Sequence, residues 1–318
     1  MIKYKISVRA IAYVNPSFPY GGMAFDSKYD ILKKFFHYPE FIARTILIPS
    51  NNRSMDFIQS KIKEFQLKYP MVAKPDKAHR GNGFRILRSE IDLRKYLIDC
   101  ERVFLLQEYI SYPMEYGIFW IRIPNSKGKI TSITRKILPE LIGNGKSTLK
   151  ELIFSDHRAK FLAKTYFEKN LERLNWILSK EDSFKISNAG NHCQGAIFED
   201  GDSDIKGKTL AKLIEISASI SGFDFGRMDI KFKDEESLLN GQNFKILEVN
   251  GSEAESTHIY DRKYSILYAY QTLYSQWDAL FKIASINKAN GVKAMSYFDF
   301  FKNYISFFKD GNPEISAD

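Results

Sequence analysis

The spacing of hydrophobic residues along the chain predicts several helices. Apolar positions recur at helical intervals, and Ser, Thr or acidic residues stand where these helices would begin. The expected helices are residues 27–37, residues 56–69, a segment that begins near Ser89, a segment capped by Ser147 or Thr148 that runs toward Phe154, and residues 157–178.

Strands are expected where β-branched and aromatic residues cluster between turn residues. In residues 225–232, the alternation places Phe225, Arg227, Asp229 and Lys231 on one face. Two antiparallel strands with polar groups on a shared face form a rigid platform for charged ligands. The expected strands are residues 71–74, 84–87, 103–109, 115–123, 130–138, 225–232 and 244–249.

The composition favours a globular protein with its own apolar core. The chain has 318 residues, of which 44% are hydrophobic and 27% charged, and this length leaves room for about two domains. No apolar run approaches the roughly 18 residues that cross a bilayer, and no cleavable leader is evident, so we expect a cytoplasmic protein. Two cysteines, Cys100 and Cys193, allow at most one disulfide, so no disulfide framework is expected.

Charge is distributed unevenly between the two halves of the chain. Residues 1–150 carry 26 Lys and Arg against 13 Asp and Glu, whereas residues 151–318 carry 21 against 25. A basic half and an acidic half suit a polyphosphate and its divalent cations, respectively. Solvated helix faces explain many of the scattered lysines equally well. Nucleic-acid binding is not expected, because the chain has no recognisable motif for it and no clustered basic stripe.

A lysine at the end of one expected strand precedes a loop that contains two glycines. Lys74 is followed by Pro75, and Gly81 and Gly83 precede the next strand. Backbone N–H groups and an ammonium can converge on phosphate oxygens in such a loop. A plain hairpin turn is the alternative interpretation, because the third glycine and the strand-to-helix context of a dinucleotide site are absent.

Acidic and amide side chains recur on the last two expected strands. Asp229, Glu248 and Asn250 offer hard oxygen ligands for one or two Mg²⁺ ions. Arg227 shares the face of Asp229 and can stabilise charge on a transferring phosphoryl group. A surface ladder of cross-strand ion pairs is the alternative, and the third ligand makes the metal site the better interpretation.

Four segments, in this order, resemble the ATP-grasp ligases. The resemblance extends over residues 24–262 and is closest to enzymes of the D-alanine:D-alanine ligase and cyanophycin synthetase type. The segments are Lys74-Pro75 with the Gly81 and Gly83 loop, Gln107-Glu108-Tyr109-Ile110, Arg227-x-Asp229, and Glu248-Val249-Asn250.

The resemblance implies an α+β protein with the ATP-grasp fold, in which two α/β subdomains of mixed or antiparallel sheet grip ATP. It implies ADP-forming ligation of a carboxylate to an amine through an acyl phosphate, with ATP and one or two Mg²⁺ ions, or Mn²⁺, as cofactors. The expected partners are small-molecule carboxylate and amine substrates. The expected divisions are a reduced N-terminal segment (1–70), a small lid subdomain (71–112), a catalytic subdomain (113–285) and a helical C-terminal extension (286–318).

The resemblance also implies roles for individual residues. Lys28 and Lys74 match lysines that contact the nucleotide phosphates, and Glu115 matches the acid that binds the ribose hydroxyls. The residues from Gln107 to Ile110 match the hinge that lies against adenine. The implied nucleotide-binding set is Lys28, Lys74, Arg80, Gly81, Gly83, Gln107, Glu108, Tyr109, Ile110 and Glu115.

For the reaction itself, the implied metal ligands are Asp229, Glu248 and Asn250, and the implied catalytic residues are Arg227, Lys136, Glu255 and His258. Arg227 would stabilise the tetrahedral intermediate, and Lys136 would reach the γ-phosphate. Glu255 and His258 are candidates to orient the amine or accept its proton because they follow the metal strand. The D-alanine ligases have a Ser-Pro-Gly type turn after the position of Asn250, and this chain does not, so D-alanine is not implied as the substrate.

Two further expectations concern the C-terminal extension and the alternative function. Aromatic residues there recur near helical spacing, and they are expected to pack on the core or, alternatively, to form a homodimer or membrane-surface contact. The alternative function is that of an ATP-binding regulatory or scaffolding relative without turnover. The aromatic residues are Tyr297, Phe298, Phe300, Phe301, Tyr304, Phe307 and Phe308.

Overall fold

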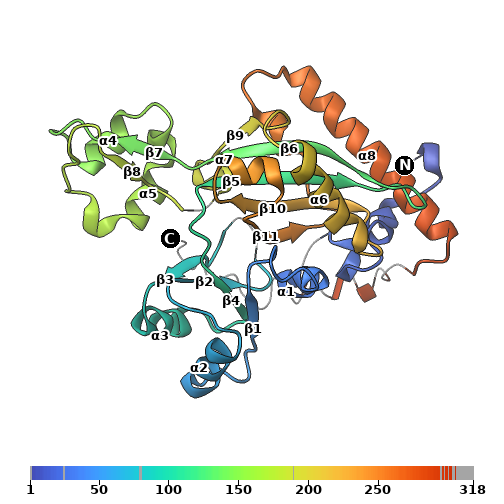
Figure 1. The fold of residues 1–318 in the computed structure, drawn as a ribbon, viewed down its shortest axis with the longest axis horizontal. Helices are drawn as coiled ribbons and strands as arrows, with labels where there is room; N and C mark the ends of the chain where they lie inside the picture. Colours follow the sequence, from blue (N-terminus) through green and yellow to red (C-terminus); the bar gives the residue numbers. More distant parts are fainter. Residues whose placement is uncertain are drawn as a thin grey trace.

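The computed structural model describes residues 2–23, 26–78, 81–188 and 190–293, and positions 296, 298, 299, 301, 302 and 305 after these. The described strands form a four-stranded, a five-stranded and a two-stranded sheet, and all neighbouring strands are antiparallel. Helices pack on these sheets, so the expected mixture of helices with antiparallel sheets is confirmed. The three sheets lie in different regions of the molecule (Figure 1).

The four-stranded sheet has the strand order β1 (Thr45–Ile48), β4 (Phe104–Glu108), β2 (Met71–Pro75) and β3 (Arg85–Leu87). Two helices pack against it, and Ile58 and Leu93 from these helices join strand residues in one buried core. Ser89 forms a capping box with Asp92 at the start of the second helix, as the acidic residues after Ser89 predicted. The two helices are α2 (Met55–Glu64) and α3 (Glu90–Asp99).

The four-stranded sheet contains β1, a strand that the sequence analysis did not predict. β1 pairs with β4 over Thr45 to Ile48, within the segment that we assigned to the N-terminal part of the chain. A four-residue strand next to a proline gives only a short apolar run, so its pairing was not evident from spacing. The division of the chain at residue 70 stays a prediction.

The five-stranded sheet has the order β11 (Phe244–Asn250), β10 (Phe225–Phe232), β5 (Met114–Ile121), β6 (Lys129–Ile137) and β9 (Ile197–Asp200). Four of these strands were predicted from the sequence to within about two residues at each end. The fifth, β9, was not. Its position at the sheet edge and its short length, Ile197 to Asp200, leave little alternation to detect.

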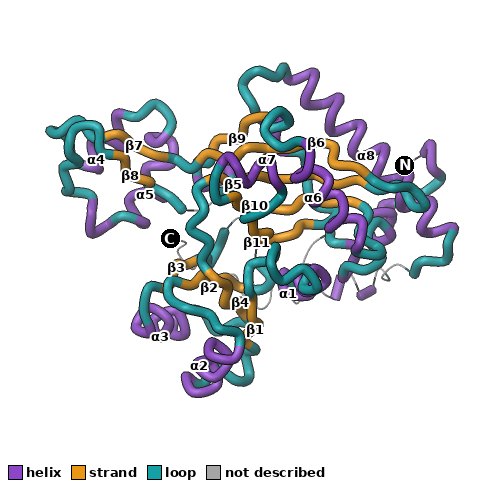
Figure 2. Tube along the Cα trace, viewed as in Figure 1, coloured by secondary structure: helices purple, strands orange, loops and turns teal. Residues whose placement is uncertain are grey.

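Helices cover one face of the five-stranded sheet. α6 (Gly207–Ser219) and α7 (Glu235–Asn240) pack there, and Leu213 of α6 joins Met228 and Ile230 of β10 in a buried core. Figure 2 shows both helices drawn across the strands of this sheet. Every second residue of β10 therefore points away from these helices, toward the opposite face.

The opposite face is covered at one end by the N-terminal and C-terminal parts of the chain. The 3-10 helix η2 (Val8–Tyr13) contacts the long helix α8 (Ile266–Ala289), and Leu280 of α8 packs with Phe119 and Phe225 of the sheet. The other end of this face carries polar side chains and meets the four-stranded sheet. We call this polar end the site face.

β11 contains a bulge that changes the direction of its side chains. The register passes from Asp229 opposite Glu248 to Ile230 opposite Ile246, so Leu247 is an extra residue without a partner on β10. Ile246 and Val249 both point into the core, and Glu248 turns to the site face because of the extra residue.

The two-stranded sheet belongs to a separate lobe with its own core. β7 (Glu140–Ile142) pairs with β8 (Ser183–Lys185), and α4 (Leu149–Ser155) and α5 (Ala163–Lys169) pack beside them. Thr148 caps α4 through a capping box with Glu151, which confirms one of the two predicted caps. Figure 1 shows this lobe projecting from one end of the five-stranded sheet.

The prediction of one long helix over residues 157–178 is wrong. The structure has a helix only over α5, with single turns of 3-10 helix before and after it. The side chain of Asn170 ends the helix because its amide donates to the carbonyls of Tyr166 and Ile186. The residues beyond it then bond to the start of α4, where the N–H of Leu149 donates to the carbonyl of Trp176.

Near the N-terminus, α1 (Lys28–Leu32) lies within the predicted helix 27–37, and Ser27 caps it. In the C-terminal extension, Phe298 and Phe301 are exposed. Tyr297, Phe300, Tyr304, Phe307 and Phe308 lie outside the described residues. None of the helices in the described ranges has the length and apolar character that crossing a bilayer requires.

Candidate functional site

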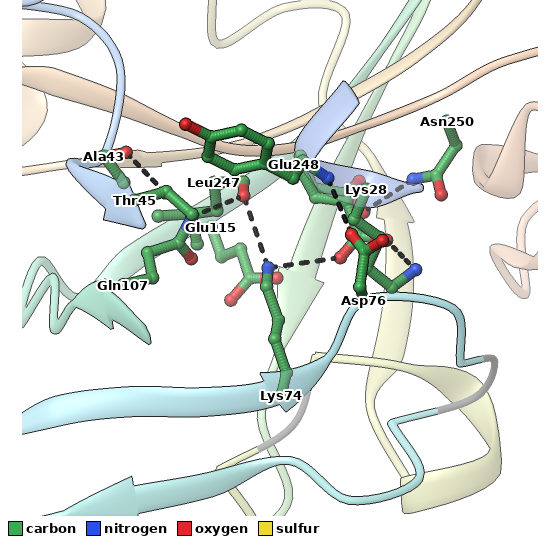
Figure 3. A network of polar contacts seen from close by, with 12 residues as sticks. Lys28, Ala43, Thr45, Lys74, Asp76, Gln107, Glu115, Leu247, Glu248 and Asn250 are labelled. Carbon is green, nitrogen blue, oxygen red and sulfur yellow. Dashed lines mark hydrogen bonds and ion pairs between the residues drawn. The ribbon is translucent and has the colours of Figure 1, made fainter. Parts of the chain in front are cut away.

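The four-stranded sheet contacts the five-stranded sheet at the bulge of β11. The side-chain amide of Gln107 donates to the carbonyl of Leu247 at 3.0 Å, and the Lys74 ammonium lies 3.5 Å from the same oxygen. Gln107 also donates to the hydroxyl of Thr45, so its position is fixed on both sides. Figure 3 shows Lys74 extending from β2 toward Leu247 and Glu248.

The three expected metal ligands lie together on the site face. Asp229 of β10 is directly opposite Glu248 of β11, and Arg227 is opposite Asn250. The amide nitrogen of Asn250 lies 3.4 Å from Oδ2 of Asp229. The arrangement that the sequence predicted from two separate strands is therefore present, and it depends on the bulge at Leu247.

Two lysines from the N-terminal half hold the Glu248 carboxylate. Lys28 Nζ lies 2.9 Å from its Oε1, and Lys74 Nζ lies 3.7 Å from its Oε2. Burial opposes the charged form of Glu248, but these two ammonium groups outweigh burial and lower the pKa of the carboxyl. For Lys74, burial prevails and lowers the pKa of the ammonium. Lys28 and Lys74, the two lysines expected to contact the nucleotide phosphates, thus both pair with the same carboxylate.

Asp229 is held from the other side by Lys136 and Arg227. Lys136 Nζ and Arg227 Nε each lie 3.0 Å from Oδ1 of Asp229. Burial again opposes ionisation, but the guanidinium and the ammonium hold the pKa of the Asp229 carboxyl below its usual range. Both carboxylates of the pair are consequently ionised at neutral pH.

Two ionised carboxylates in register, with an amide beside them, fit the oxygen ligands that Mg²⁺ prefers. Among the described residues, no group of three or more His, Cys, Asp or Glu side chains is arranged to hold a metal ion. Asn250 lies beside Asp229 and brings an amide oxygen to this group. Asp229, Glu248 and Asn250 are the residues that would hold the ion.

Glu115 is buried and lies between Lys136 and a glycine. Lys136 Nζ is 3.2 Å from Oε1 of Glu115, and the two residues face each other across β5 and β6. A Cβ atom added to Gly190 would stand 2.3 Å from Oε1 of Glu115, so the loop between β8 and β9 passes directly over the carboxylate. Glu115 therefore links the site face to this loop.

The hinge residues use most of their polar groups to join the two sheets. The Glu108 carboxylate pairs with Arg44 at 2.7 Å and with Lys245 at 3.6 Å, and the N–H of Glu108 donates to the carbonyl of Arg44. The Glu108 carboxylate is thus engaged in ion pairs within the protein, and its place in the hinge against adenine stays a prediction. The carbonyl of Ile110 accepts from Lys231, and the Lys231 ammonium lies 5.9 Å from the centre of the Tyr109 ring.

Lys231 is a residue of the site that the sequence analysis placed on the correct face but gave no role. It follows Asp229 by two positions on β10, and burial lowers the pKa of its ammonium. Its bond to Ile110 connects the five-stranded sheet to the hinge. Alternation identified its face, but nothing in the spacing indicated that the hinge would lie above it.

The loop between β2 and β3 fixes the start of α1. Oδ1 of Asp76 accepts from the Ser27 hydroxyl and from the N–H of Tyr29, each at 3.0 Å. Gly81 and Gly83, further along this loop, have φ angles of +76° and +71°, which favour glycine. Arg80 lies outside the described residues. Asp76 therefore positions the turn of α1 that carries Lys28.

Of the two residues expected to act on the amine, only Glu255 contacts the described site. Its backbone carbonyl accepts from Arg227 at 3.2 Å, and its carboxylate accepts from the Tyr260 hydroxyl at 2.7 Å. His258 is buried, and its Nε2 lies 3.1 Å from the hydroxyl of Tyr268 on α8. The structure therefore brings Glu255 to Arg227 but turns His258 toward α8.

Comparison with known proteins gives distant similarities. No family model matches the chain. Cyanophycin synthetase from Synechocystis sp. is 25% identical over 209 residues, which are 60% of this chain and 24% of that protein. The chain thus corresponds to about a quarter of the length of this relative.

Three solved enzyme structures are also similar to this chain. A bifunctional glutathione synthetase from Pasteurella multocida gives a TM-score of 0.39 at 13% identity, covering 72% of this chain and 33% of its own. A D-Ala:D-Ser ligase from Enterococcus faecalis gives 0.45 at 14%, covering 82% and 61%. Carboxyaminoimidazole ribonucleotide synthase from Aspergillus clavatus, complexed with ATP, gives 0.45 at 11%, covering 74% and 46%. The three TM-scores lie between 0.39 and 0.45, and we take no residue roles from these structures.

Proposed function

We propose that the chain is an ADP-forming ligase that joins a substrate carboxylate to an amine, with ATP and Mg²⁺. The observation that carries this proposal is the opposition of Asp229 and Glu248 at the junction of two sheets, where Lys28, Lys74 and Lys136 converge. Ionised carboxylates beside three ammonium groups suit a polyphosphate that arrives with its cation.

The proposed reaction has two steps. A carboxylate oxygen of the first substrate attacks the γ-phosphorus of ATP, the bond from this phosphorus to the ADP oxygen breaks, and an acyl phosphate forms. An amine nitrogen then attacks the acyl carbon, the bond to the phosphate oxygen breaks, and an amide and inorganic phosphate result. Mg²⁺, when bound, supplies charge neutralisation for the phosphate oxygens.

Different residues of the site have different roles in the proposed reaction. In this proposal, Lys28 and Lys74 bind phosphate oxygens, and Lys136 binds the transferred phosphoryl group. Arg227 stabilises negative charge on the tetrahedral intermediate that follows attack by the amine. Positioning and electrostatic stabilisation account for most of the catalysis, because ATP provides the driving force.

A substrate screen tests the proposal. Wild-type protein, ATP and Mg²⁺ are incubated with a library of small carboxylates and amines, and ADP release is followed together with mass spectrometry of any condensed product. The proposal predicts ADP release that requires both a carboxylate and an amine. ATP binding without ADP release across the library would instead support a regulatory or scaffolding ATP-binding protein.

A further inference from the structure

In the part of the chain that the structure describes, the long helix α8 has an apolar face that is exposed to solvent. Its residues, which we call the α8 stripe, are Ile266, Leu267, Tyr270, Tyr274 and Trp277. Apart from Leu267, they follow one another at intervals of three or four residues, so they lie on one side of the helix. The side chains of Tyr270, Tyr274 and Trp277 are 65%, 72% and 47% exposed. Figure 1 shows α8 at the periphery of the molecule, where a partner can reach it.

The other side of α8 is fixed to the body of the protein. Leu280 and Ile283 join the buried core on the five-stranded sheet. The side-chain oxygen of the buried Gln276 accepts from the N–H of Ser256 at 3.3 Å. The α8 stripe is therefore held in place before any partner arrives, and this lowers the entropy cost of binding.

The α8 stripe lies in a stretch without charge. Residues 265–277 include no charged residue, although 27% of the whole chain is charged. The next charged side chain, Asp278, already pairs with Lys3 at 2.8 Å. The surface of α3, by contrast, carries an ion pair between Glu90 and Arg94. Because exposed helix faces are normally polar or charged, an uncharged apolar stripe indicates a surface that contacts another protein.

The α8 stripe is large enough to form the centre of a stable interface. Its three aromatic side chains present about 300–450 Å² of surface, and the two aliphatic ones extend this to roughly 400–600 Å². A standard interface buries about 800 Å² on each partner, of which somewhat more than half is apolar. A depression of about 580 Å³ on the same helix offers room for side chains of a partner. It is lined by Tyr270, Gln271, Leu273, Tyr274, Ser275 and Trp277.

The chemistry of the α8 stripe suits a second copy of this chain. In a two-fold symmetric dimer each patch faces the same patch of the partner, so a charged patch would meet its own sign. The α8 stripe has no charge, and Gln271, Ser275 and the tyrosine hydroxyls beside it can each both donate and accept a hydrogen bond. A helix that lies on a membrane surface typically carries Lys or Arg along its polar face, and residues 265–277 have none.

We propose that the chain forms a symmetric homodimer in which the α8 stripe of one copy packs against the α8 stripe of the other. This surface is different from the C-terminal aromatic residues, which follow α8 in the chain and which the sequence analysis considered for a dimer contact. The inference concerns assembly only, so it does not depend on the proposed function.

Sedimentation velocity on the full chain, over a series of protein concentrations, tests the assembly directly. The mass of one copy is 36.9 kDa. We expect a species of twice this mass, with a dissociation constant of about 10 μM or below, since the apolar area matches that of standard interfaces. A monomer at every concentration up to about 100 μM overturns the proposal.

Lysine variants identify the surface responsible. Tyr270→Lys and Tyr274→Lys place like charges in the interface from both copies, so each is expected to raise the dissociation constant of the dimer about tenfold or more. Both positions are exposed, and thermal unfolding checks that the variants fold as the wild type does. Ile98→Lys, at a 78% exposed position of α3, is the matched control and should leave the dissociation constant unchanged. Increases below about tenfold for both tyrosine variants overturn the proposal.

Two further measurements distinguish the second copy from other occupants. A dimer that dissociates in Phe298→Lys, at an exposed position of the C-terminal extension, but persists in both tyrosine variants overturns the proposal. Flotation of the wild type with vesicles of phosphatidylcholine and phosphatidylserine, abolished by Tyr274→Lys, would assign the α8 stripe to a membrane surface and also overturns it. A dimer that only the two tyrosine variants weaken, without vesicle binding, supports the proposal.

Discussion

The Lys28 ammonium lies 2.9 Å from Oε1 of Glu248, although 220 residues separate them along the chain. Lys28 comes from the first turn of α1, which Asp76 anchors, and Lys74 reaches the same carboxylate from β2. The charge of Glu248 is therefore balanced by two cations from two different elements. Removal of this carboxylate would leave both ammonium groups without their partner.

Glu248→Gln and Asp229→Asn should each reduce turnover by roughly 100-fold or more while ATP still binds, because the lost oxygen acts on charge that develops during phosphoryl transfer. ADP release and calorimetry with ATP measure the two effects. Glu235→Gln on α7 is an exposed control and should behave as wild type. Wild-type turnover in either site variant would refute the metal assignment.

Lys74→Ala should weaken ATP binding itself by about tenfold, since one charge-assisted contact to phosphate is lost. Calorimetry gives the dissociation constant directly. Lys95→Ala removes an exposed lysine from α3 and serves as the control. An unchanged dissociation constant for the Lys74 variant would remove this residue from the nucleotide site.

Gly190→Ala should destabilise the loop over Glu115, because the new Cβ would stand 2.3 Å from Oε1 of the carboxylate. Overpacking of this kind typically costs about 1–3 kcal/mol. Urea unfolding measures the loss. In a Glu115→Ala background, where the clashing atoms are absent, the same substitution should cost clearly less. Equal costs in both backgrounds would show that the clash is not the cause.

Asp26→Asn should stabilise the protein more at pH 8 than at pH 5. Burial, followed by the charge of Glu253, raises the pKa of the Asp26 carboxyl from 3.8 to about 8, and its Oδ1 is buried without a hydrogen-bond partner. The folded state thus holds a proton that the unfolded state releases, so stability is full below pH 3.8 and falls as the pH rises through about 8.

Urea unfolding at both pH values gives the difference between wild type and variant. Asp56→Asn, at an exposed position on α2, controls for the change of net charge. A stabilisation that is independent of pH, or larger at pH 5, would contradict the assignment of the proton to Asp26.

Local alternation of residues along β10 predicted which side chains face the site. The two-residue period of β10 placed Arg227, Asp229 and Lys231 on one face, and the structure confirms this. For β11, strict alternation from Phe244 would have buried Glu248 with Ile246. Grouping it with Asp229 relied on residue type and family resemblance, and the physical reason is an extra residue that spacing does not reveal.

Interactions between distant segments account for what the sequence did not predict. The helix expected over 157–178 is interrupted because the amide of Asn170 bonds to the carbonyl of Ile186, on another segment. The ion pairs of Glu108 with Arg44 and Lys245 could not be predicted either, because these partners come from segments whose proximity depends on the fold. Propensity and spacing carry no information about such partners.

The extra residue in β11 also limits how the two halves of the site can move. Gln107 and Lys74 both converge on one backbone oxygen, that of Leu247. If the four-stranded sheet rotates outward at this point, both hydrogen bonds to the Leu247 carbonyl break, at a net cost of about 1–3 kcal/mol. Because the acceptor belongs to the main chain, no substitution of the side chain at position 247 removes it. The contact between the two sheets is thus fixed by the backbone of β11, and it persists whichever residue stands at position 247.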